Sequence, residues 1–583
     1  MKSSSIVFAL FLAACGASPD GEDADSVSLA VNEGGVPCVH VVDASNTALQ
    51  SWCSTGSPGQ ACRSDRLSSS SSCGQVSATA LQDAITWAST QAPLVGGRRQ
   101  IRLDRTPNPD STPFWMVPQP VYGDFTAGVL VPSNFQVEGT VATNGWEAGS
   151  WVQQLDISQG FHAGVMVVDP AGYATYADRD KPVSNVVIKN IKIRGFYANG
   201  LSTVYSALFG FTSTGNVTLE RFNARDTEHA IILGWFDPTN PQWDAAIGKL
   251  RSKLWAFNGT SAAAKNLVQY CYTENVPGDT IVIMGNRNKV HSCTVTNSPP
   301  VSTAYSGILV YGGYSDIDIT GNNISGIGNG IGLDGNFLAA CVNGDPACTC
   351  TANQTPEQCM DKWNGYVAAQ GVGLVAGYNS QVTISGNTIN MPALVNARGI
   401  QFYRDHSCDV SGNTINGPGR GYAGSIGIHL AEADSNFLWS NTVKNANIGV
   451  QLSAGLSSRT TPTAGVLHGS SYNGIGVVRG SFAAAGNVVQ NNETNLKLVG
   501  LPGSQLARVS QNTIKNNKLN NTTTFSPAAS CNYELGSYGT DQATGGSEKQ
   551  YCGSGAAGNS SSPTQGALQS SSCNYVVGHT RCK

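Results

Sequence analysis

The chain has 583 residues, of which 12% are charged, and its formal net charge is −4 at pH 7. This balance offers no basic surface for nucleic acid or for an anionic membrane, so we expect neither as a binding partner. The 67 glycines, together with many Ser, Thr and Asn residues, are typical of a chain built from short strands and tight turns.

The first residues predict export and a lipid anchor. A short basic start precedes the apolar run 6–14, which is too short to cross a membrane as a helix and ends directly before Cys15. The pattern Leu-Ala-Ala-Cys resembles a bacterial lipoprotein signal, which implies that a signal peptide (residues 1–14) is removed and Cys15 receives the lipid. An ordinary secretory signal with an incidental cysteine is the alternative. Residues 15–36 are small and acidic, which predicts a flexible tether. We therefore expect the protein in the bacterial cell envelope, at the outer membrane or the cell surface.

Most of the 16 cysteines fall into three groups of four, each in a segment rich in Gly and Ser. In an exported protein such groups favour loops held by disulfides, and a zinc site at Cys348 and Cys350 is the rival interpretation. The groups lie in a predicted N-terminal cap (residues 37–94), in an insertion, and in a predicted C-terminal cap (residues 521–583). Their members are Cys38, Cys53, Cys62 and Cys73; Cys341, Cys348, Cys350 and Cys359; and Cys531, Cys552, Cys573 and Cys582.

Residues 76–88 predict the one clear helix. Leu81, Ala84, Ile85 and Ala88 have helical spacing, and a Ser or Thr shortly before them could act as the N-cap. Strand candidates follow at residues 100–103 and 129–137. A helix in this place is expected to close the N-terminal end of a solenoid, because that end would otherwise expose unpaired strand edges.

Between residues 95 and 520 the sequence repeats a unit of three short strands. Residues 381–389 read QVTISGNTI and residues 399–403 read GIQFY; residues 408–415 then read CDVSGNTI and residues 427–430 read GIHL. Strands this short do not form a stable sheet alone, but units that recur about every 25 residues can stack as the coils of a solenoid.

Two positions of the unit can be followed along the chain. An Asn at the first position tolerates the unusual backbone angles of a bend, and its amide can bond the Asn of neighbouring coils. The members of this first column are Cys271, Cys293, Asn322, Asn387, Asn413, Asn441, Asn487 and Asn512. The second column holds the first inward apolar residue of the third strand, which in most units follows Gly: Ile231, Ile281, Ile308, Ile331, Ile400, Ile428 and Val450. Cys271 and Cys293 are expected to be neighbours on adjacent coils, either bridged or buried as small side chains, and Cys408 is left over.

This pattern resembles the right-handed parallel β-helix proteins of the pectin-lyase-like superfamily over roughly residues 95–520. The resemblance implies an all-β solenoid, and its right hand also follows the rule for parallel crossovers. Gly278 and Asp279 resemble the strand of polygalacturonases that carries paired Asp residues, with Gly278 in place of one of them. The Asn-Thr-Asp and Gly-His-Gly motifs of that family and the Asp-Pro-His motif of mannuronan epimerases are absent. The resemblance therefore indicates the fold and no single family.

Two insertions interrupt the coils, at residues 236–264 and 336–370. Each leaves the chain directly after a Gly-Ile strand, so both are expected to flank the same face of the solenoid. Insertions on one face often form the walls of a binding site, although simple decoration is the alternative. The sequence therefore predicts a substrate cleft on the outer face of the Gly-Ile strands.

Residues that alternate with the buried Ile and Leu should point outward on that face. The turn before each strand holds His229, Asp279, Ser306, Asn329 and Arg398; the middle outward position holds Ile232, Val282, Leu309, Gly332, Gln401, His429 and Gln451; and the last holds Gly234, Met284, Tyr311, Asp334, Tyr403, Ala431 and Ser453. Since neighbouring coils stack about 4.8 Å apart, His229 and Asp279 are expected within hydrogen-bonding reach.

Candidate roles follow from residue type. Asp279 and His229 form an acid/base or orienting pair, Arg398 or Arg404 clamps a uronate carboxylate, and Tyr403 donates a proton or stacks on a sugar, with Asp334 nearby. The candidate substrate-binding residues are Tyr311, Gln401, His429, Trp235 and Trp243.

A face with acids, bases, Arg and aromatic side chains favours a polysaccharide as substrate. The leading hypothesis is an enzyme that cleaves a uronate polymer by β-elimination; hydrolysis by two carboxylates is the second, and a non-catalytic glycan-binding adhesin is the third. We expect a monomer without an organic cofactor, and Ca²⁺ is a possible aid to the elimination. An unsaturated product would separate the first hypothesis from the others.

Overall fold

The computed structural model describes residues 39–52, 80–92 and 97–103, most of residues 114–235, 265–334 and 379–453, and strand segments between residues 481 and 552. The predicted lipoprotein signal (1–14), the tether (15–36) and the two insertions (236–264 and 336–370) lie outside the described residues. The same is true of the predicted N-terminal cysteine group and of the last two members of the Asn column: Cys38, Cys53, Cys62, Cys73, Asn487 and Asn512. The Cys-rich C-terminal cap also lies outside them, apart from strands β42 and β43.

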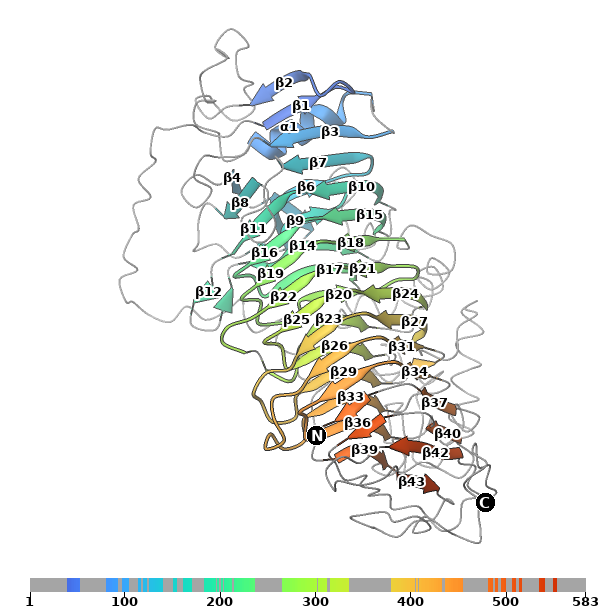
Figure 1. Ribbon diagram of the computed structural model, residues 1–583. Helices are drawn as coiled ribbons and strands as arrows, with labels where there is room; N and C mark the ends of the chain where they lie inside the picture. Colours follow the sequence, from blue (N-terminus) through green and yellow to red (C-terminus); the bar gives the residue numbers. More distant parts are fainter. Residues whose placement is uncertain are drawn as a thin grey trace, which may run out of the picture.

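The described chain winds through three parallel sheets, and each coil gives one strand to each sheet in turn (Figure 1). Sheet 1 contains β3 (Arg99–Leu103), β7 (Phe135–Gly139), β10 (Val183–Lys189), β15 (Thr214–Glu220), β18 (Leu267–Gln269), β21 (Lys289–His291), β24 (Ser315–Thr320), β27 (Asn379–Ser385), β30 (Asp405–His406), β31 (Asp409–Ser411), β34 (Phe437–Trp439), β37 (Ser481–Ala485), β40 (Leu506–Val509) and β42 (Glu534–Gly539), with β43 (Lys549–Cys552) antiparallel to β42.

Sheet 2 contains β4 (Phe114–Met116), β8 (Ser150–Gln154), β11 (Ile191–Arg194), β16 (Asn223–Arg225), β19 (Tyr272–Glu274), β22 (Thr294–Thr296), β25 (Asn323–Ser325), β28 (Thr388–Asn390), β32 (Thr414–Asn416), β35 (Thr442–Lys444), β38 (Val488–Gln490) and β41 (Thr513–Lys515). The strands are short because each coil must turn again after a few residues.

Sheet 3 contains β5 (Gln119–Tyr122), β6 (Phe125–Val131), β9 (Phe161–Val167), β14 (Val204–Phe211), β17 (His229–Trp235), β20 (Ile281–Ile283), β23 (Ser306–Tyr311), β26 (Asn329–Asp334), β29 (Arg398–Tyr403), β33 (Ile426–Ala431), β36 (Ile448–Ser453) and β39 (Thr494–Val499). A small hairpin of β12 (Tyr197–Ala198) and β13 (Leu201–Ser202) projects between β11 and β14. Three parallel sheets wound in this order are a parallel β-helix, so the fold class predicted from the sequence is confirmed.

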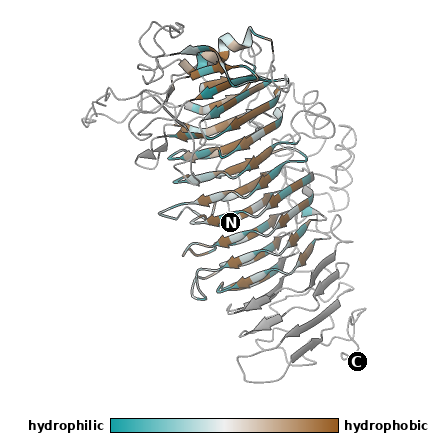
Figure 2. Cartoon of the chain, turned by 45° about the horizontal axis from the view of Figure 1, so that its top comes forward, coloured by the Kyte–Doolittle hydropathy of each residue, from teal (hydrophilic) through white to brown (hydrophobic). Residues whose placement is uncertain are grey.

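The core lies between the three sheets, and the predicted Gly-Ile column is part of it. Ile231 pairs with Ile281, and the register continues coil by coil to Val450. Every Ile of this column is fully buried. Figure 2 shows the resulting alternation of apolar and polar residues along the stacked strands.

The glycine that precedes the isoleucine in the later coils has a steric reason. A Cβ on Gly307 would lie 2.8 Å from Ile324 Cγ2, and one on Gly399 would lie 2.6 Å from Ile415 Cγ2. The second residue of these sheet 3 strands therefore lies so close to the inward side chains of sheet 2 that only a hydrogen atom fits. In the earlier coils Ala230 and Thr280 precede the isoleucine instead.

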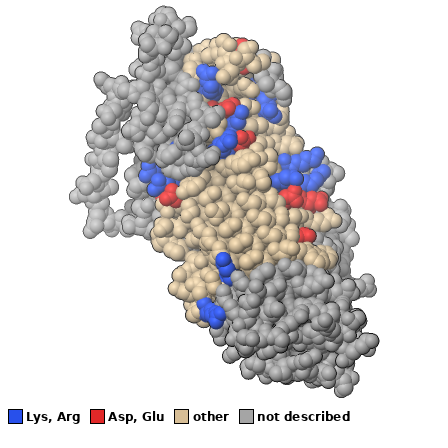
Figure 3. Space-filling view, viewed as in Figure 1, with Lys and Arg blue, Asp and Glu red and all other residues tan. Residues whose placement is uncertain are grey.

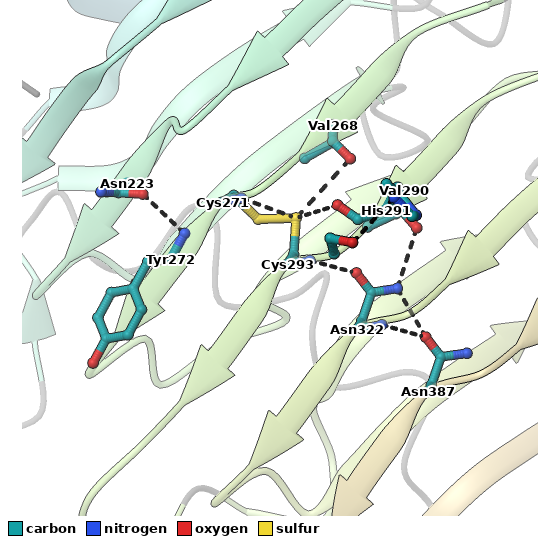
Figure 4. The surroundings of a disulfide bond; sticks show 10 residues. Asn223, Val268, Cys271, Tyr272, Val290, His291, Cys293, Asn322 and Asn387 are labelled. Carbon is teal, nitrogen blue, oxygen red and sulfur yellow. Dashed lines mark hydrogen bonds between the residues drawn. A yellow bond between two sulfur atoms is a disulfide. The ribbon is translucent and has the colours of Figure 1, made fainter. Parts of the chain in front are cut away.

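The predicted Asn column forms a hydrogen-bonded ladder (Figure 4). Each side-chain oxygen accepts bonds from the preceding Asn of the column: Asn387 Oδ1 accepts from Asn322 N and Nδ2, both at 2.9 Å, and Asn413 Oδ1 accepts from Asn387 N at 3.0 Å and Nδ2 at 2.9 Å. Asn441 Oδ1 continues the series below Asn413. The ladder satisfies amides that are almost completely buried.

The bend itself differs from the prediction. The left-handed backbone angle belongs to the residue before the ladder residue, with φ of 65° at Gly321 and 64° at Gly386 and Gly412, and not to the Asn. Gly takes this conformation at little cost. In the tripeptide Ser/Thr-Gly-Asn, the Gly therefore makes the bend, and the Asn side chain forms the hydrogen bonds between coils.

At the N-terminal end of the ladder, cysteines take the place of the Asn residues. Cys271 and Cys293 form a disulfide between adjacent coils, which decides between the two alternatives left by the sequence. Cys293 N still donates to Asn322 Oδ1 at 2.8 Å, so the ladder continues into the disulfide. Cys408 is buried, and its backbone N–H donates to Asn436 Oδ1 at 2.8 Å.

The ladder makes a stability prediction. Asn413→Leu should lower the free energy of unfolding by about 1 to 3 kcal/mol, because Asn387 and Asn441 both lose a buried partner. Asn416, three residues later, bonds Asn390 on the outer face, so Asn416→Leu should change it by less than about 0.5 kcal/mol. Thermal unfolding of both variants provides the measurement. Equal shifts of the two melting temperatures would mean that the ladder does not stabilise the fold.

The N-terminal end is closed as expected, with an addition. Helix α1 (Ala80–Ser89) buries Leu81, Ala84, Ile85 and Ala88 against the first coils, so the predicted capping helix is confirmed. The sequence did not reveal β1 (Val39–Val42) and β2 (Ala48–Trp52), which pair antiparallel with each other, while β1 pairs antiparallel with β3. This reversal of direction ends the parallel stack at sheet 1.

Candidate functional site

The long connections leave one edge of sheet 3. The chain runs from Trp235 of β17 to β18, and from Asp334 of β26 to β27, through the two predicted insertions. A third long connection joins Ser453 of β36 to β37. All three begin where a strand of sheet 3 ends, which agrees with the predicted place of departure.

The predicted outward positions are in register. Ile232, Val282 and Leu309 follow one another on successive strands, as do Tyr311, Asp334 and Tyr403. The prediction that the whole row faces solvent is wrong for the first coils, because Ile232 is 0% and Val282 3% exposed. Residues 230–233 of β17 and all three residues of β20 are apolar, which is the pattern of a strand covered on both faces. The accessible part of the face begins at Leu309 and continues through Gln401 and His429, which are partly exposed.

Asp279 is the central group of the candidate site. The backbone N–H of Ser306, on the next coil, donates to Asp279 Oδ1 at 2.6 Å. Burial raises the pKa of the Asp279 carboxyl to about 7, the Ser306 bond opposes this shift, and the charge of Asp334 adds to it. The two carboxyl groups therefore interact electrostatically, although they come from coils two turns apart.

His229 and Asp279 are brought together as expected, but through the backbone. His229 Nδ1 lies 2.7 Å from the carbonyl oxygen of Asp279. Burial lowers the pKa of His229 to about 4, and the bond to Asp279 opposes the shift. Because a carbonyl only accepts, Nδ1 carries the proton of the neutral ring. His229 also packs edge-on against Tyr205. It thus holds the turn that carries Asp279 and does not touch the Asp279 carboxylate through this bond.

Two further side chains of the same row form a pair beside Asp279. Asn329 Nδ2 donates to Ser306 Oγ at 3.0 Å. Both side chains lie over Gly332, where a Cβ would be 2.6 Å from Ser306 Oγ and 2.8 Å from Asn329 Nδ2. Sequence reasoning placed Asn329 in the row but gave it no role. The glycine at an outward position, two residues before Asp334, is the signal that could have directed attention to it.

Arg398 occupies the same row and is held by backbone. Its Nη1 donates to Asn396 O at 2.7 Å, to Ala397 O at 3.1 Å and to Gly424 O at 2.5 Å. Burial lowers the pKa of Arg398 to about 10, so the guanidinium remains charged at neutral pH. This nitrogen joins two loops of neighbouring coils and has no room for a uronate carboxylate.

The structure describes the side chains of some of the remaining predicted residues and not of others. His429 and Gln451 are neighbours on β33 and β36, and His429 Nε2 lies 3.2 Å from Gln451 Nε2. Tyr311 is half-buried and packs against the core. The side chains of Tyr403 and Trp235, and the whole of Arg404 and Trp243, lie outside the described residues.

The face is poor in charge. In Figure 3, the described surface over β20, β23 and β26 is largely uncharged, and Lys, Arg, Asp and Glu side chains gather around it. The residues that the structure describes contain no group of three or more His, Cys, Asp or Glu side chains arranged to hold a metal ion. No helix among them is long and apolar enough to cross a membrane.

No protein-family model matches the chain, and no curated protein matches it. Among solved structures it is similar to the A-module of mannuronan C-5 epimerase AlgE6 from Azotobacter vinelandii, with 11% identity, 79% of this chain and 95% of that chain covered, and a TM-score of 0.39. It is also similar to a tailspike protein mutant of E. coli bacteriophage HK620 (13% identity, 86% and 79% covered, TM-score 0.38) and to the periplasmic alginate epimerase AlgG (11%, 72% and 86%, TM-score 0.33).

Similarities this weak carry no argument about activity. The strand register and the three stacked sheets define the class: the chain is a parallel β-helix protein, as the repeat in its sequence predicted.

Proposed function

We propose that this protein is a polysaccharide-cleaving enzyme that hydrolyses glycosidic bonds, with Asp279 as general acid. The proposal rests on the Asp279 carboxyl, which is held at the start of the sheet 3 strands by the Ser306 N–H and whose pKa is raised to about 7, mainly by burial. A carboxyl group whose pKa is raised toward neutrality by its surroundings is the group with which glycosidases protonate the leaving oxygen.

The reaction follows from this carboxyl group. Protonated Asp279 donates its proton to the glycosidic oxygen as the bond from that oxygen to the sugar carbon breaks. A water molecule attacks the same carbon and gives up a proton to the solvent, so that the released sugar carries a new hydroxyl group. His229 positions Asp279 through the backbone, because its Nδ1–H bonds the carbonyl of that residue.

The rest of the face suits an extended glycan. Leu309, Gln401 and His429 lie on β23, β29 and β33 of sheet 3, with β26 between the first two. Neighbouring coils are about 4.8 Å apart, a step comparable to one sugar residue. Amide and imidazole groups on this row can bond sugar hydroxyls. Of the two predicted uronate clamps, Arg398 already uses Nη1 to bond three backbone carbonyls, and Arg404 lies outside the described residues.

A panel of neutral and uronate polysaccharides tests the proposal. The purified protein is incubated with galactan, mannan, xylan, polygalacturonate and alginate, and both reducing ends and the ultraviolet absorbance of unsaturated sugars are followed. Hydrolysis releases reducing ends without this absorbance. An absorbing product would instead establish β-elimination, and binding without cleavage would establish the glycan-binding adhesin.

Export and attachment of a lipid at Cys15 belong to the same proposal, since an enzyme at the cell surface reaches polymers that cannot enter the cell. Incorporation of labelled fatty acid into the wild type and not into Cys15→Ala is the expected result. Equal labelling of both would contradict the anchor.

A further inference from the structure

Two aromatic side chains are exposed side by side on sheet 1, which is a different face from that of the candidate site. Phe437 and Trp439 are the first and last residues of β34, and each is 39% exposed. Leu438 between them is buried in the core, which fixes the two rings on the outer face of the strand. The ring centroids are 6.2 Å apart, and the ring planes are inclined by only 11°. The pair therefore offers two nearly parallel rings to the solvent.

This pair differs from the other exposed apolar side chains that the structure describes. Those three lie on three different elements: Leu49, Tyr270 and Val395. Tyr270 already has a cation over its ring, because the guanidinium carbon of Arg221 lies 5.7 Å from the ring centroid, and His291 packs edge-on against it. Aromatic rings left in water are costly, so two of them on one strand indicate a surface that binds something.

Polar side chains precede both rings on the outer face of sheet 1. In the strand register of β27, β31 and β34, one row is Thr383, Asp409 and Phe437, and the other is Ser385, Ser411 and Trp439. The four polar members are partly exposed. Their hydroxyl and carboxyl groups can bond sugar hydroxyls. The strip covers two steps of about 4.8 Å between coils, which is comparable to two or three sugar residues.

The size of the apolar surface distinguishes a glycan from a protein partner. At 39% exposure the two side chains together offer on the order of 200 Å² of accessible surface. A stable protein interface, including one between two copies of this chain, takes about 800 Å² from each partner around an apolar centre. A sugar needs much less, because its C–H face covers one aromatic ring while its hydroxyls bond polar side chains at the edge.

We propose that Phe437 and Trp439, with Ser385 and Ser411 beside them, form a polysaccharide-binding site on sheet 1. The chain passes from β33 of sheet 3 to β34 through residues 432–436, so the strip lies on the neighbouring face of the same coil (Figure 1). A polymer bound there is held at the protein while another part of it reaches sheet 3. Binding at this strip needs no hydrolysis, so the inference goes beyond the proposed function and applies equally to a glycan-binding adhesin.

Affinity electrophoresis of the full chain tests the site. All proteins carry Asp279→Asn, so that no polymer is cut, and run in native gels that contain galactan, mannan, xylan, polygalacturonate or alginate. Trp439→Ala and Phe437→Ala should each weaken binding of the polymer that retards the parent most about 10-fold, and the double variant should abolish retardation. Trp439→Phe keeps a ring and should stay within about threefold. Tyr270→Ala removes an exposed aromatic ring elsewhere and should stay within about twofold.

Tryptophan fluorescence gives a second readout that needs no alanine variant. A sugar stacked on Trp439 removes the indole from water, so the polymer should shift the emission to shorter wavelength, and Trp439→Phe should lose this shift. Melting curves of all variants should match that of the parent, because the exchanged side chains are exposed.

Three results would overturn the inference. They are retardation of the parent by none of the five polymers, unchanged retardation of both alanine variants, and a change of sedimentation coefficient without a change of glycan affinity, which would make the pair a contact between copies of the chain. Turnover tests the proposed function separately. Full activity of Asp279→Asn would overturn that function and leave the site on sheet 1 unaffected.

Discussion

Asp279→Asn is expected to lower the rate of glycan cleavage on the order of 100-fold or more, because an amide cannot donate the proton that the leaving oxygen needs. The loss should appear in kcat, since Asn keeps the size of the side chain and can still accept the Ser306 N–H bond. The exposed Asp316, changed to Asn, provides the control and should retain full activity. Full activity of Asp279→Asn would remove this residue from the mechanism.

The same variant should be more stable than the wild type above neutral pH. The pKa of Asp279 is about 7 in the folded protein against an ordinary value of 3.8. Below about pH 4 the carboxyl is neutral in both the folded and the unfolded chain, so the raised pKa does not lower stability there. As pH rises from about 4 to 7 the unfolded chain ionises first, and stability is lost. Asp279→Asn removes this loss, so at about pH 8 the gain should be on the order of 2 kcal/mol and should vanish at about pH 4.

The contribution of His229 to stability depends on pH in the opposite direction. Its folded pKa is about 4 against an ordinary value of 6.5, so its contribution to stability is complete above 6.5 and is lost as pH falls toward 4. Melting curves of wild type and Asp279→Asn across this range separate the two groups, because the variant retains only the His229 dependence. A variant that shows no gain at alkaline pH would mean that Asp279 is ionised without cost.

Gly399→Ala is expected to destabilise the protein by about 3 kcal/mol or more, because the added methyl group has no space at this position. The new Cβ would meet the carbonyl oxygen of Gly427 and lie 2.6 Å from Ile415 Cγ2. Neither atom can withdraw, because one is backbone of the next coil and the other is buried core.

Gly421→Ala is the matched control for this prediction. A Cβ on Gly421 would meet no atom within 4 Å, so the change should be neutral or slightly stabilising. Thermal and denaturant unfolding of both variants measure the difference. Equal stability of the two alanine variants would contradict the close approach of sheets 2 and 3.

The coil register could be predicted from sequence because two independent marks fix it in every unit. The Asn of the ladder and the Ile after Gly occur at constant places relative to short alternating strands, and a slip by one residue would turn every Ile outward. Both marks proved to be core positions, from Ile231 and Cys271 to Val450 and Asn441.

The candidate site could be predicted only as a row of residues. Which residues share the row follows from register, so Asp279, Ser306 and Asn329 were placed correctly side by side. Their bonds depend on the turn geometry, and for that reason the His229 bond to a carbonyl could not be foreseen. Burial of Ile232 on the outer face was missed because alternation alone does not say whether an outward position is covered.

The most direct test of the central claim, that Asp279 acts as the protonated acid of the site, is the pH dependence of kcat/KM on a polymer that the protein cleaves. We expect a profile with a falling alkaline limb whose apparent pKa is about 7, because deprotonation of Asp279 removes the general acid. Activity should therefore be highest on the acid side of neutrality. A rate that stays constant or rises as pH increases through 7 would contradict the assignment.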